Sequence, residues 1–570
     1  FSTEFGDITF RSITGYRESK VDNEDEDSDY RAADAIGNQR YLTDIDTFTQ
    51  EFRLSGTNGA MDWLVGAFYY DESIYFESDI DFGTQWRNYA NILVGGSPAA
   101  GEAVIGGLEA LLGYPTGTFF EPGTGVLEMA TMDNETMSVF GQASFDLTSR
   151  TQLTLGFNYL DDEKDVGISQ INDDAFSKLA LDGTDGATAL TNAGFLGAFP
   201  SAFAATFGLP YTPDNAALVG SSPAGAAGLQ QLQAGVLGQV AAAVAMADLS
   251  DPTQNPFLGL QALQFLPQML ELPNAADDGT SADEKFTYTA SISHDFSDQL
   301  NVYLTYATGY KATSWNLSRD TRPTQGEYDA LVSAGVALPN NLTIGTRLAG
   351  PEESEVLELG IKYNAQWGYI NAAFFNQTIE GFQSNVFTGA GFNLANAGEQ
   401  SVDGVEVDVM LRPTERLSLG VSGTYLDPFY DAFVGANVGG AAEDLSGTKP
   451  GGIPELTLSL IGSYDFTIMG MDAWIQADYR YDKEVDIQDG GDQSASNILL
   501  ETTGSRTREV GLLNASVGIA KNGWEFRVWG RNLTNDEYLI TWFPSVAQTG
   551  SFSGYPNQPR MWGASIKKSF

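Results

Sequence analysis

The chain of 570 residues contains no cysteine and only one histidine, His294. The lack of cysteine excludes disulfide bonds and thiolate metal sites, and a single histidine leaves almost no scope for histidine-based catalysis or haem binding. Basic residues are scarce as well: 29 lysines and arginines stand against 75 acidic residues, which gives a net charge of −46. Nucleic acid is therefore excluded as a partner, because phosphate binding needs a basic surface.

Long apolar runs are also missing. No stretch approaches the roughly 18 apolar residues of a transmembrane helix, and the first residues do not resemble a signal peptide. A transmembrane β-strand needs only about 10 residues of alternating hydrophobicity, so these absences disfavour a helical membrane protein but not a β-barrel. No nucleophile elbow, metal-ligand pair or histidine–acid pair is visible, and we expect no enzymatic activity.

What the chain has instead is alternation, most clearly in residues 511–570. Val517 lies on one face of this pattern and Ser516 on the other, and Asn522-Gly523 matches a two-residue hairpin turn. The chain ends on apolar residues at period two, namely Trp562, Ile566 and Phe570. Because an exposed apolar end strand is a liability in a soluble protein, we expect it to close a barrel onto the first strand.

Similar patterns predict about sixteen strands in all. Short turns, for example at residues 57–60, 148–150 and 297–299, alternate with longer connections, and a brief link before Phe392 is the exception. Apolar positions such as Leu419 and Val421 oppose small or polar ones such as Ser422. Together these features predict an all-β, transmembrane antiparallel β-barrel with short periplasmic turns, long extracellular loops and a periplasmic C-terminus.

Two long connections carry helical patterns. Residues 97–113 and 225–247 are rich in alanine and leucine, residues 257–272 repeat leucine and phenylalanine at helical spacing, and residues 170–282 form the longest insertion. We expect these loop helices to pack above the barrel mouth, to hold another protein, or to act as a lid. Clusters of acidic residues predict a solvated outer rim or, alternatively, weak divalent-cation sites; no cofactor is expected.

Several motifs resemble those of TonB-dependent outer-membrane receptors. They are residues 48–55 with 63–70, residues 305–311 with 351–362, residues 396–398 with 404–406, and residues 531–538 with 559–570. The resemblance implies a twenty-two-stranded barrel filled by an N-terminal plug, which the TonB–ExbB–ExbD system pulls from the inner membrane. The plug and about six strands have no counterpart in residues 1–570, so we expect them to precede residue 1 or to lie in a separate chain beside the barrel.

The resemblance also implies a function: active import of a scarce ligand such as a metal chelate or siderophore, a cobalamin-like molecule or a carbohydrate. The acidic rim disfavours anionic siderophores within a Debye length of about 8 Å, and the single histidine disfavours haem. The barrel is expected to contact outer-membrane lipid and lipopolysaccharide. A passive sixteen-stranded channel and a surface protein whose apolar loops hold a partner are the alternatives.

Candidate ligand contacts are aromatic and basic residues expected at the outer ends of strands, because aromatic faces suit sugars and chelate rings and arginine suits carboxylates. These residues are Trp86, Arg87, Trp315, Arg319, Arg322, Tyr430, Trp542 and Phe543.

Overall fold

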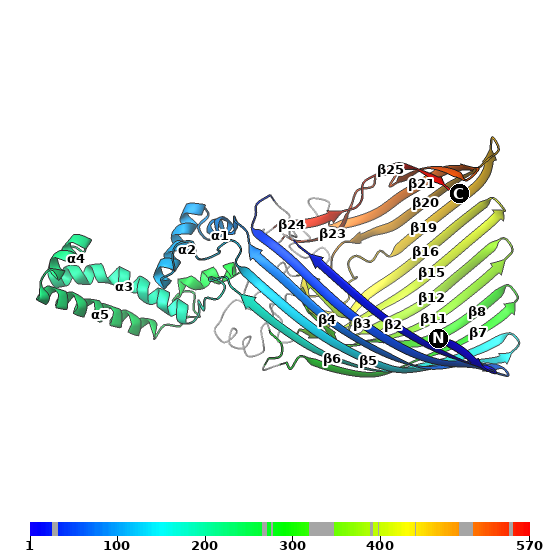
Figure 1. Ribbon diagram of the computed structural model, residues 1–570, viewed down its shortest axis with the longest axis horizontal. Helices are drawn as coiled ribbons and strands as arrows, with labels where there is room; N and C mark the ends of the chain where they lie inside the picture. Colours follow the sequence, from blue (N-terminus) through cyan, green and yellow to red (C-terminus); the bar gives the residue numbers. More distant parts are fainter. Residues whose placement is uncertain are drawn as a thin grey trace.

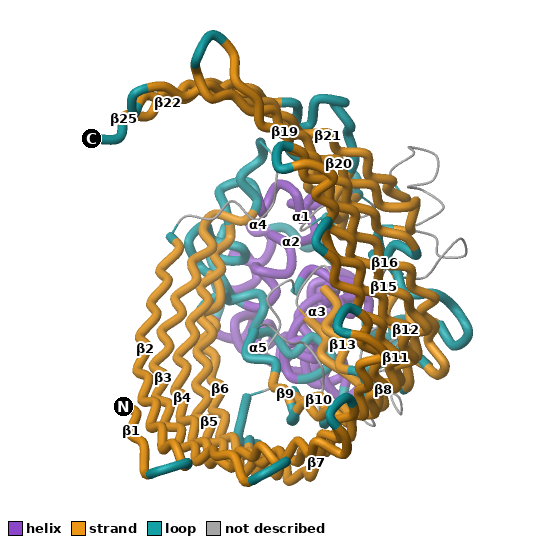
Figure 2. The backbone as a smooth tube through the Cα atoms, turned by 90° about the vertical axis from the view of Figure 1, so that its right-hand side faces the viewer, coloured by secondary structure: helices purple, strands orange, loops and turns teal. Residues whose placement is uncertain are grey.

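A single curled antiparallel sheet of seventeen strands dominates the computed structural model (Figures 1 and 2). The structure describes residues 1–24, 32–264, 271–274, 277–318, 347–387, 392–396, 398–438, 441–489, 506–545 and 551–570. Each sheet strand pairs with the next sheet strand along the chain, as the β3–β4 and β21–β22 ladders illustrate. This up-and-down order is the one expected of a transmembrane barrel.

The strands of the sheet, in pairing order, are β1 (Ser2–Phe5), β2 (Ile8–Asn23), β3 (Ile36–Asn58), β4 (Met61–Phe82), β5 (Gly125–Thr148), β6 (Thr151–Asn172), β7 (Thr280–Ser297), β8 (Leu300–Lys311), β11 (Glu352–Ala365), β12 (Gly368–Glu380), β15 (Glu399–Thr414), β16 (Leu417–Ala432), β19 (Leu456–Ile468), β20 (Met471–Asp486), β21 (Thr507–Lys521), β22 (Trp524–Arg531) and β25 (Met561–Lys568).

Short turns join the strands at one end of the sheet and long connections join them at the other (Figure 1). The β21–β22 turn has positive φ at both central residues, 51° at Asn522 and 76° at Gly523, which is the type I′ geometry that matches the twist of the flanking strands. In the part of the chain that the structure describes, four long connections contain a hairpin of their own: β9 (Ser314–Trp315) with β10 (Leu348–Ala349), β13 (Gln383–Phe387) with β14 (Phe392–Asn396), β17 (Val434–Val438) with β18 (Ala441–Asp444), and β23 (Leu539–Pro544) with β24 (Phe552–Pro556).

The prediction of only a brief connection before Phe392 is wrong. The connection between β12 and β15 is long, so the alternation of short turns and long connections has no exception there. The segment predicted as two long strands is divided into β12, the β13–β14 hairpin and β15. Gly381 ends β12 with φ of 67°, a left-handed conformation that interrupts a strand. A Cβ atom at Gly381 would lie 2.7 Å from the carbonyl oxygen of Pro351, so the chain also needs glycine there for close approach.

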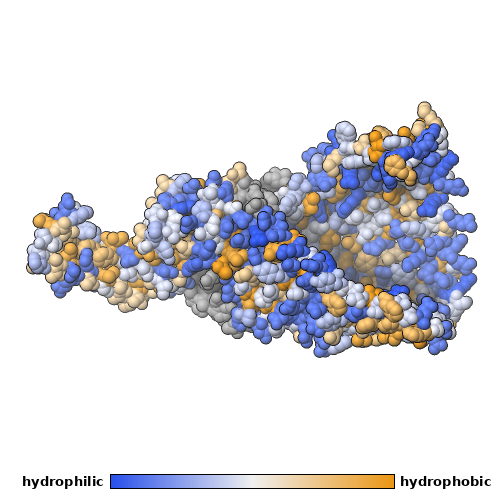
Figure 3. All heavy atoms as spheres, in the orientation of Figure 1, coloured by the Kyte–Doolittle hydropathy of each residue, from blue (hydrophilic) through white to orange (hydrophobic). Residues whose placement is uncertain are grey.

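Side chains on the sheet alternate between an apolar outer face and a small or polar inner face. Val421 and Val517 are 39% and 45% exposed, whereas Gly420 and Ser516 on the opposite face are buried. Figure 3 shows apolar residues gathered on the outer surface of the strands toward the short-turn end. An exposed apolar band of this kind suits contact with lipid.

The last strand does not close the sheet. β25 pairs with β22 over eight residue pairs, and among the described residues its other edge has no strand partner. Figure 2 shows the two edges of the sheet apart, whereas ladder hydrogen bonds need strands about 4.8 Å apart. Within the described residues the sheet therefore stays open, and the closing of a barrel by Trp562, Ile566 and Phe570, whose side chains are all exposed, stays a prediction.

Helices occupy two of the long connections. They are α1 (Trp86–Gly95) and α2 (Pro98–Leu112) between β4 and β5, and α3 (Thr184–Phe207), α4 (Pro213–Gly220), α5 (Pro223–Val244) and the 3₁₀ helix η1 (Pro256–Leu263) between β6 and β7. Ser97 and Ser222 accept hydrogen bonds from the N–H groups of Ala100 and Gly225, which caps the predicted helices α2 and α5. The predicted helix at residues 257–272 is confirmed only as η1, and residues 265–270 lie outside the described residues.

The helices form two units with separate cores. α1, α2 and η1 pack on the ends of β4 and β5 around Trp86, Ile105 and Phe119. α3, α4 and α5 form a helical arm that projects away from the sheet (Figure 1) and is centred on Phe199, Phe203 and Val236. None of the helices in the described part of the chain has the length and apolar character needed to span a membrane.

Candidate functional site

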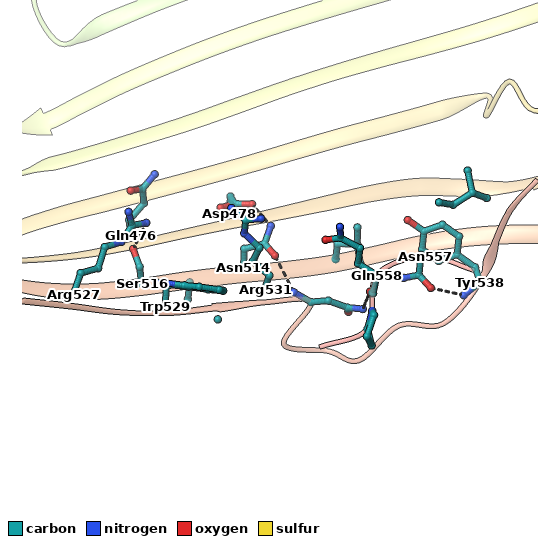
Figure 4. A pocket seen from close by; sticks show the side chains of 16 residues that line it. Gln476, Asp478, Asn514, Ser516, Arg527, Trp529, Arg531, Tyr538, Asn557 and Gln558 are labelled. Atoms are coloured by element: carbon teal, nitrogen blue, oxygen red, sulfur yellow. Dashed lines mark hydrogen bonds between the residues drawn. The ribbon is translucent and has the colours of Figure 1, made fainter. Parts of the chain in front are cut away.

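A cavity lined by polar, charged and aromatic side chains lies on the inner face of the last strands (Figure 4). It has a volume of about 780 Å³ and is lined by β20, β21, β22 and the connection that follows β22. Strand alternation explains its composition, because every second residue of a strand points to the same face. Arg527, Trp529 and Arg531 of β22 therefore line the cavity together, while Phe526 and Val528 between them are exposed on the apolar face.

The charges of this cavity are unusual for so acidic a chain. Arg527 donates from Nη2 to Ser516 Oγ at 3.1 Å, and the Arg531 guanidinium lies 5.5 Å from the Trp529 ring centre. Within the described residues, neither arginine forms an ion pair. Asp478 is the one carboxylate in the lining, and it accepts from Asn514 Nδ2 at 2.7 Å. The lining thus carries two guanidinium groups against one carboxylate.

One wall of the cavity is held by the segment 531–538, part of the C-terminal motif. Asn532 has φ of 48°; its Nδ2 donates to the carbonyl oxygens of Asp536 and Gln558, and its Oδ1 accepts from Asp536 N. Asp536 in turn accepts from Gly511 N at 2.6 Å. These hydrogen bonds fold the connection back onto β21, which fixes the cavity wall without any ligand.

Trp86 and Arg87, two of the predicted contacts, lie in the first helical unit. Trp86 is buried and stacks on Phe82 with ring centres 5.0 Å apart. Arg87 donates to Glu102 and Glu109, and the Glu109 side chain is fully buried. Burial by itself raises the pKa of the Glu109 carboxyl, but Arg87 and the N–H groups of Phe119 and Gly117 lower it to below the usual value. Both predicted residues therefore contribute to the loop core.

Tyr430 and Trp542 each contact residues 487–489, at a junction of three long connections. Asp489 accepts from the Tyr430 hydroxyl at 3.1 Å and from Gly451 N at 2.6 Å, and burial raises the pKa of the Asp489 carboxyl. Gln488 donates to the Trp542 carbonyl oxygen at 2.8 Å, while Ile487 packs against the Trp542 ring. The chain segment 487–489 thus links two predicted residues that are distant in sequence.

The other predicted contacts are not part of this junction. Trp315 is buried in a different core and donates from Nε1 to Ser281 Oγ at 3.0 Å. Phe543 lies 5.6 Å from Tyr555, measured between ring centres. Arg319 and Arg322 lie outside the described residues. The eight predicted residues therefore do not form one site, and whether any of them contacts a ligand stays a prediction.

Sequence reasoning missed the inner-face cavity. Its signal was present, because Arg527, Trp529 and Arg531 recur at period two in residues 524–531, and polar side chains at that spacing share a strand face. In the described part of the chain, no three histidine, aspartate or glutamate side chains converge as they would around a metal ion.

Comparisons with known proteins agree with this architecture. Three solved receptors share the fold: the ferric yersiniabactin uptake receptor FyuA of Yersinia pestis (TM-score 0.60, 12% identity, covering 100% of this chain and 60% of that one), the siderophore receptor PiuA of Acinetobacter baumannii (0.55, 14%, 99% and 62%), and the closed form of the ferric-catecholate import receptor Fiu of E. coli K12 (0.54, 12%, 99% and 62%). The chain thus spans about three fifths of these receptors.

No curated protein matches the chain in sequence. Residues 261–533 match the family described as "TonB dependent receptor-like, beta-barrel". This region includes β7 to β22. It contains two of the motif pairs from which the resemblance was inferred, residues 305–311 with 351–362 and residues 396–398 with 404–406, whereas residues 48–70 and nearly all of the C-terminal motif lie outside it. Over these residues, a little under half of its length, the chain is similar to the TonB-dependent receptor-like β-barrels.

Proposed function

We propose that the chain forms the barrel of an outer-membrane receptor that imports a scarce ligand by active transport. The observation that carries the proposal is the polarity of the sheet, in which long connections collect at one end and short turns at the other. The apolar outer face, with Val421 and Val517 exposed, supports a lipid environment. The family match over residues 261–533 supports a receptor rather than an enzyme, so no covalent change to the ligand is proposed.

The difference between the two ends of the sheet, one with long connections and one with short turns, also gives the orientation that we propose. The long connections lie outside a Gram-negative cell, and the short turns and Phe570 face the periplasm. The apolar band contacts lipid and lipopolysaccharide. Energy reaches the barrel from the TonB–ExbB–ExbD system through a plug that is not contained in residues 1–570.

The proposed ligand class is a metal chelate. FyuA, PiuA and Fiu are named for ferric yersiniabactin, siderophores and ferric catecholates, which supports such a ligand by analogy of fold. The acidic rim favours a chelate of neutral or positive net charge, because 75 acidic residues against 29 basic ones repel anions. A cobalamin-like molecule or a carbohydrate is the alternative ligand.

A second function, the binding of a surface partner, is favoured by the helical arm. Between residues 186 and 247 the only charged residue is Asp214, and Leu196, Leu218 and Met246 are exposed on the arm. Exposed apolar side chains on a loop often mark a protein contact. A partner that copurifies with the chain at fixed stoichiometry, and is lost when the arm is deleted, would support this function.

Uptake in living cells tests the proposal. A strain that lacks the gene is complemented with the full gene and supplied with labelled ferric chelates, cobalamin or oligosaccharides, with and without a proton uncoupler. We expect accumulation of one ligand class that the uncoupler abolishes. Uptake that persists with the uncoupler would instead identify a passive channel, and no uptake of any ligand by correctly inserted protein would contradict import.

A further inference from the structure

The inner-face cavity contains two arginines whose charges are not compensated. Arg527 and Arg531 are exposed, form no ion pair within the described residues, and both line the cavity of about 780 Å³. In a chain with 75 acidic side chains, most cations find carboxylates easily; Arg480 in β20, for example, pairs with Asp482 at 2.8 Å. The two arginines of β22 are therefore available to an occupant of the cavity.

We propose that this cavity binds a small organic molecule of low net charge that carries free carboxylate groups. The planar guanidinium fork matches a carboxylate with two parallel hydrogen bonds. Four residues along a strand separate the two arginines by about 13 Å, with Trp529 between them. This spacing suits an organic molecule that offers two anionic groups joined by an apolar or planar portion.

The other residues that line the cavity indicate why the bound molecule should have a low net charge. Asp478 contributes a carboxylate next to Asn514, and it can accept from an ammonium or hydroxyl group of the occupant. Asn557 and Gln558, in the connection that follows β22, add neutral amides to the lining (Figure 4). The acidic connections at the mouth repel strongly anionic molecules, so a zwitterion reaches the cavity more easily than a polyanion.

The cavity also has the size and rigidity of a small-molecule site. Its volume falls in the range of roughly 300–1,000 Å³ that is usual for such sites. The hydrogen bonds of Asn532 and Asp536 hold its wall in place, so binding does not require the connection to be ordered. This inference builds on the proposed import function, because it names a class of ligand that the barrel interior would accept.

Binding to the full chain in lipid nanodiscs tests the inference without transport, so its failure is distinguishable from failure of the import proposal. The probe is the dipeptide lysyl-glutamate, which has no net charge and two carboxylates, and its dimethyl ester is the matched control. We expect calorimetric binding of the dipeptide, loss of binding for the ester, and at least tenfold weaker binding for Arg527→Gln and for Arg531→Gln. Arg416→Gln, an exposed arginine at the short turn between β15 and β16, is expected to bind as the unaltered chain does.

Three results would overturn the inference: equal affinity for dipeptide and ester, equal affinity for inorganic phosphate, or dipeptide binding that neither arginine substitution weakens. Because a substitution could disturb folding, the unaltered chain is also titrated at increasing salt. A contact between guanidinium and carboxylate groups predicts affinity that falls with ionic strength, and a salt-independent affinity would contradict it.

Discussion

Arg87 and Glu109 form a two-armed ion pair, with Nη1 2.8 Å from Oε1 and Nη2 2.9 Å from Oε2. The Glu109 side chain is fully buried and also accepts from Phe119 N at 2.7 Å. The pair connects α1 and α2 to the chain that leads into β5. It stabilises the first helical unit, which covers the ends of β4 and β5 above the barrel.

Removal of one partner of this pair is expected to open the first helical unit. Glu109→Ala leaves the Arg87 guanidinium largely buried with Glu102 as its remaining counter-charge and removes the acceptor of Phe119 N. Breaking a buried pair typically costs about 3–5 kcal/mol. Hydrogen exchange of residues 86–112 is expected to accelerate accordingly, while exchange of the sheet stays unchanged. Glu121→Ala, which removes an exposed carboxylate in the same connection, is the matched control. Equal exchange in both variants would show that the pair does not hold the unit.

The same pair predicts a pH dependence. Burial raises the pKa of the Glu109 carboxyl, yet Arg87 and the two N–H groups outweigh burial and lower the pKa overall. The stabilisation is therefore fully present above the carboxyl's ordinary pKa and is lost as pH falls through the lowered value. Protection of residues 86–112 from exchange, corrected for the intrinsic effect of pH, is expected to decrease in acid. Glu109→Gln should remove this decrease, and an unchanged acid response in that variant would assign it to other groups.

The Asn532 hydrogen bonds are expected to stabilise the last strands. Asn532→Ala loses these hydrogen bonds. It also places alanine at positive φ, a conformation that asparagine tolerates through local hydrogen bonds and that costs other L-residues roughly 1–2 kcal/mol. Each buried group left without a partner adds about 1–3 kcal/mol. We expect a lower temperature for the heat-induced shift of the folded band on a gel. Asn535→Gly, at an exposed residue with φ of 55°, should not lower it, and a similar decrease in both variants would contradict the role of Asn532.

Gly381 is expected to set the end of β12. Gly381→Ala combines positive φ with a Cβ atom 2.7 Å from the Pro351 carbonyl oxygen, so the β13–β14 hairpin should exchange its amide hydrogens faster. In Gly462→Ala the new Cβ would meet only an ordinary contact, 3.5 Å from Leu419, and this variant should leave the hairpin unchanged. Normal hairpin protection in Gly381→Ala would show that another residue defines the end of the strand.

The architecture followed from the sequence because strand alternation is a local property. Val517 and Ser516 reveal their faces through period two, and Asn522-Gly523 specifies its own turn. The division at Gly381 was missed because a single glycine inside a strand pattern indicates either a bulge or a break, and the close contact with Pro351 that decides between them is not local. The separate edges of β2 and β25 are likewise a property of the whole sheet.

The candidate site was harder to predict from sequence than the fold. Trp86 and Arg87 have the composition of ligand contacts, but the helix that they begin turns them toward Phe82 and Glu109. No sequence pattern gives that direction, because it depends on how two connections pack. The positive inner face of β22 was accessible to sequence reasoning, since Arg527, Trp529 and Arg531 share a strand face.

The central claim is that the apolar face of the sheet contacts lipid and the other face contacts water. Because the chain contains no cysteine, single cysteines can be introduced from residue 417 to residue 425 in β16 and spin-labelled in a bilayer. The account predicts that labels at residues 419 and 421 collide with oxygen dissolved in the lipid, whereas labels at residues 420 and 422 collide with a water-soluble nickel chelate. Accessibility without this alternation, or labels shielded from both reagents on both faces, would contradict a barrel with lipid outside and water inside.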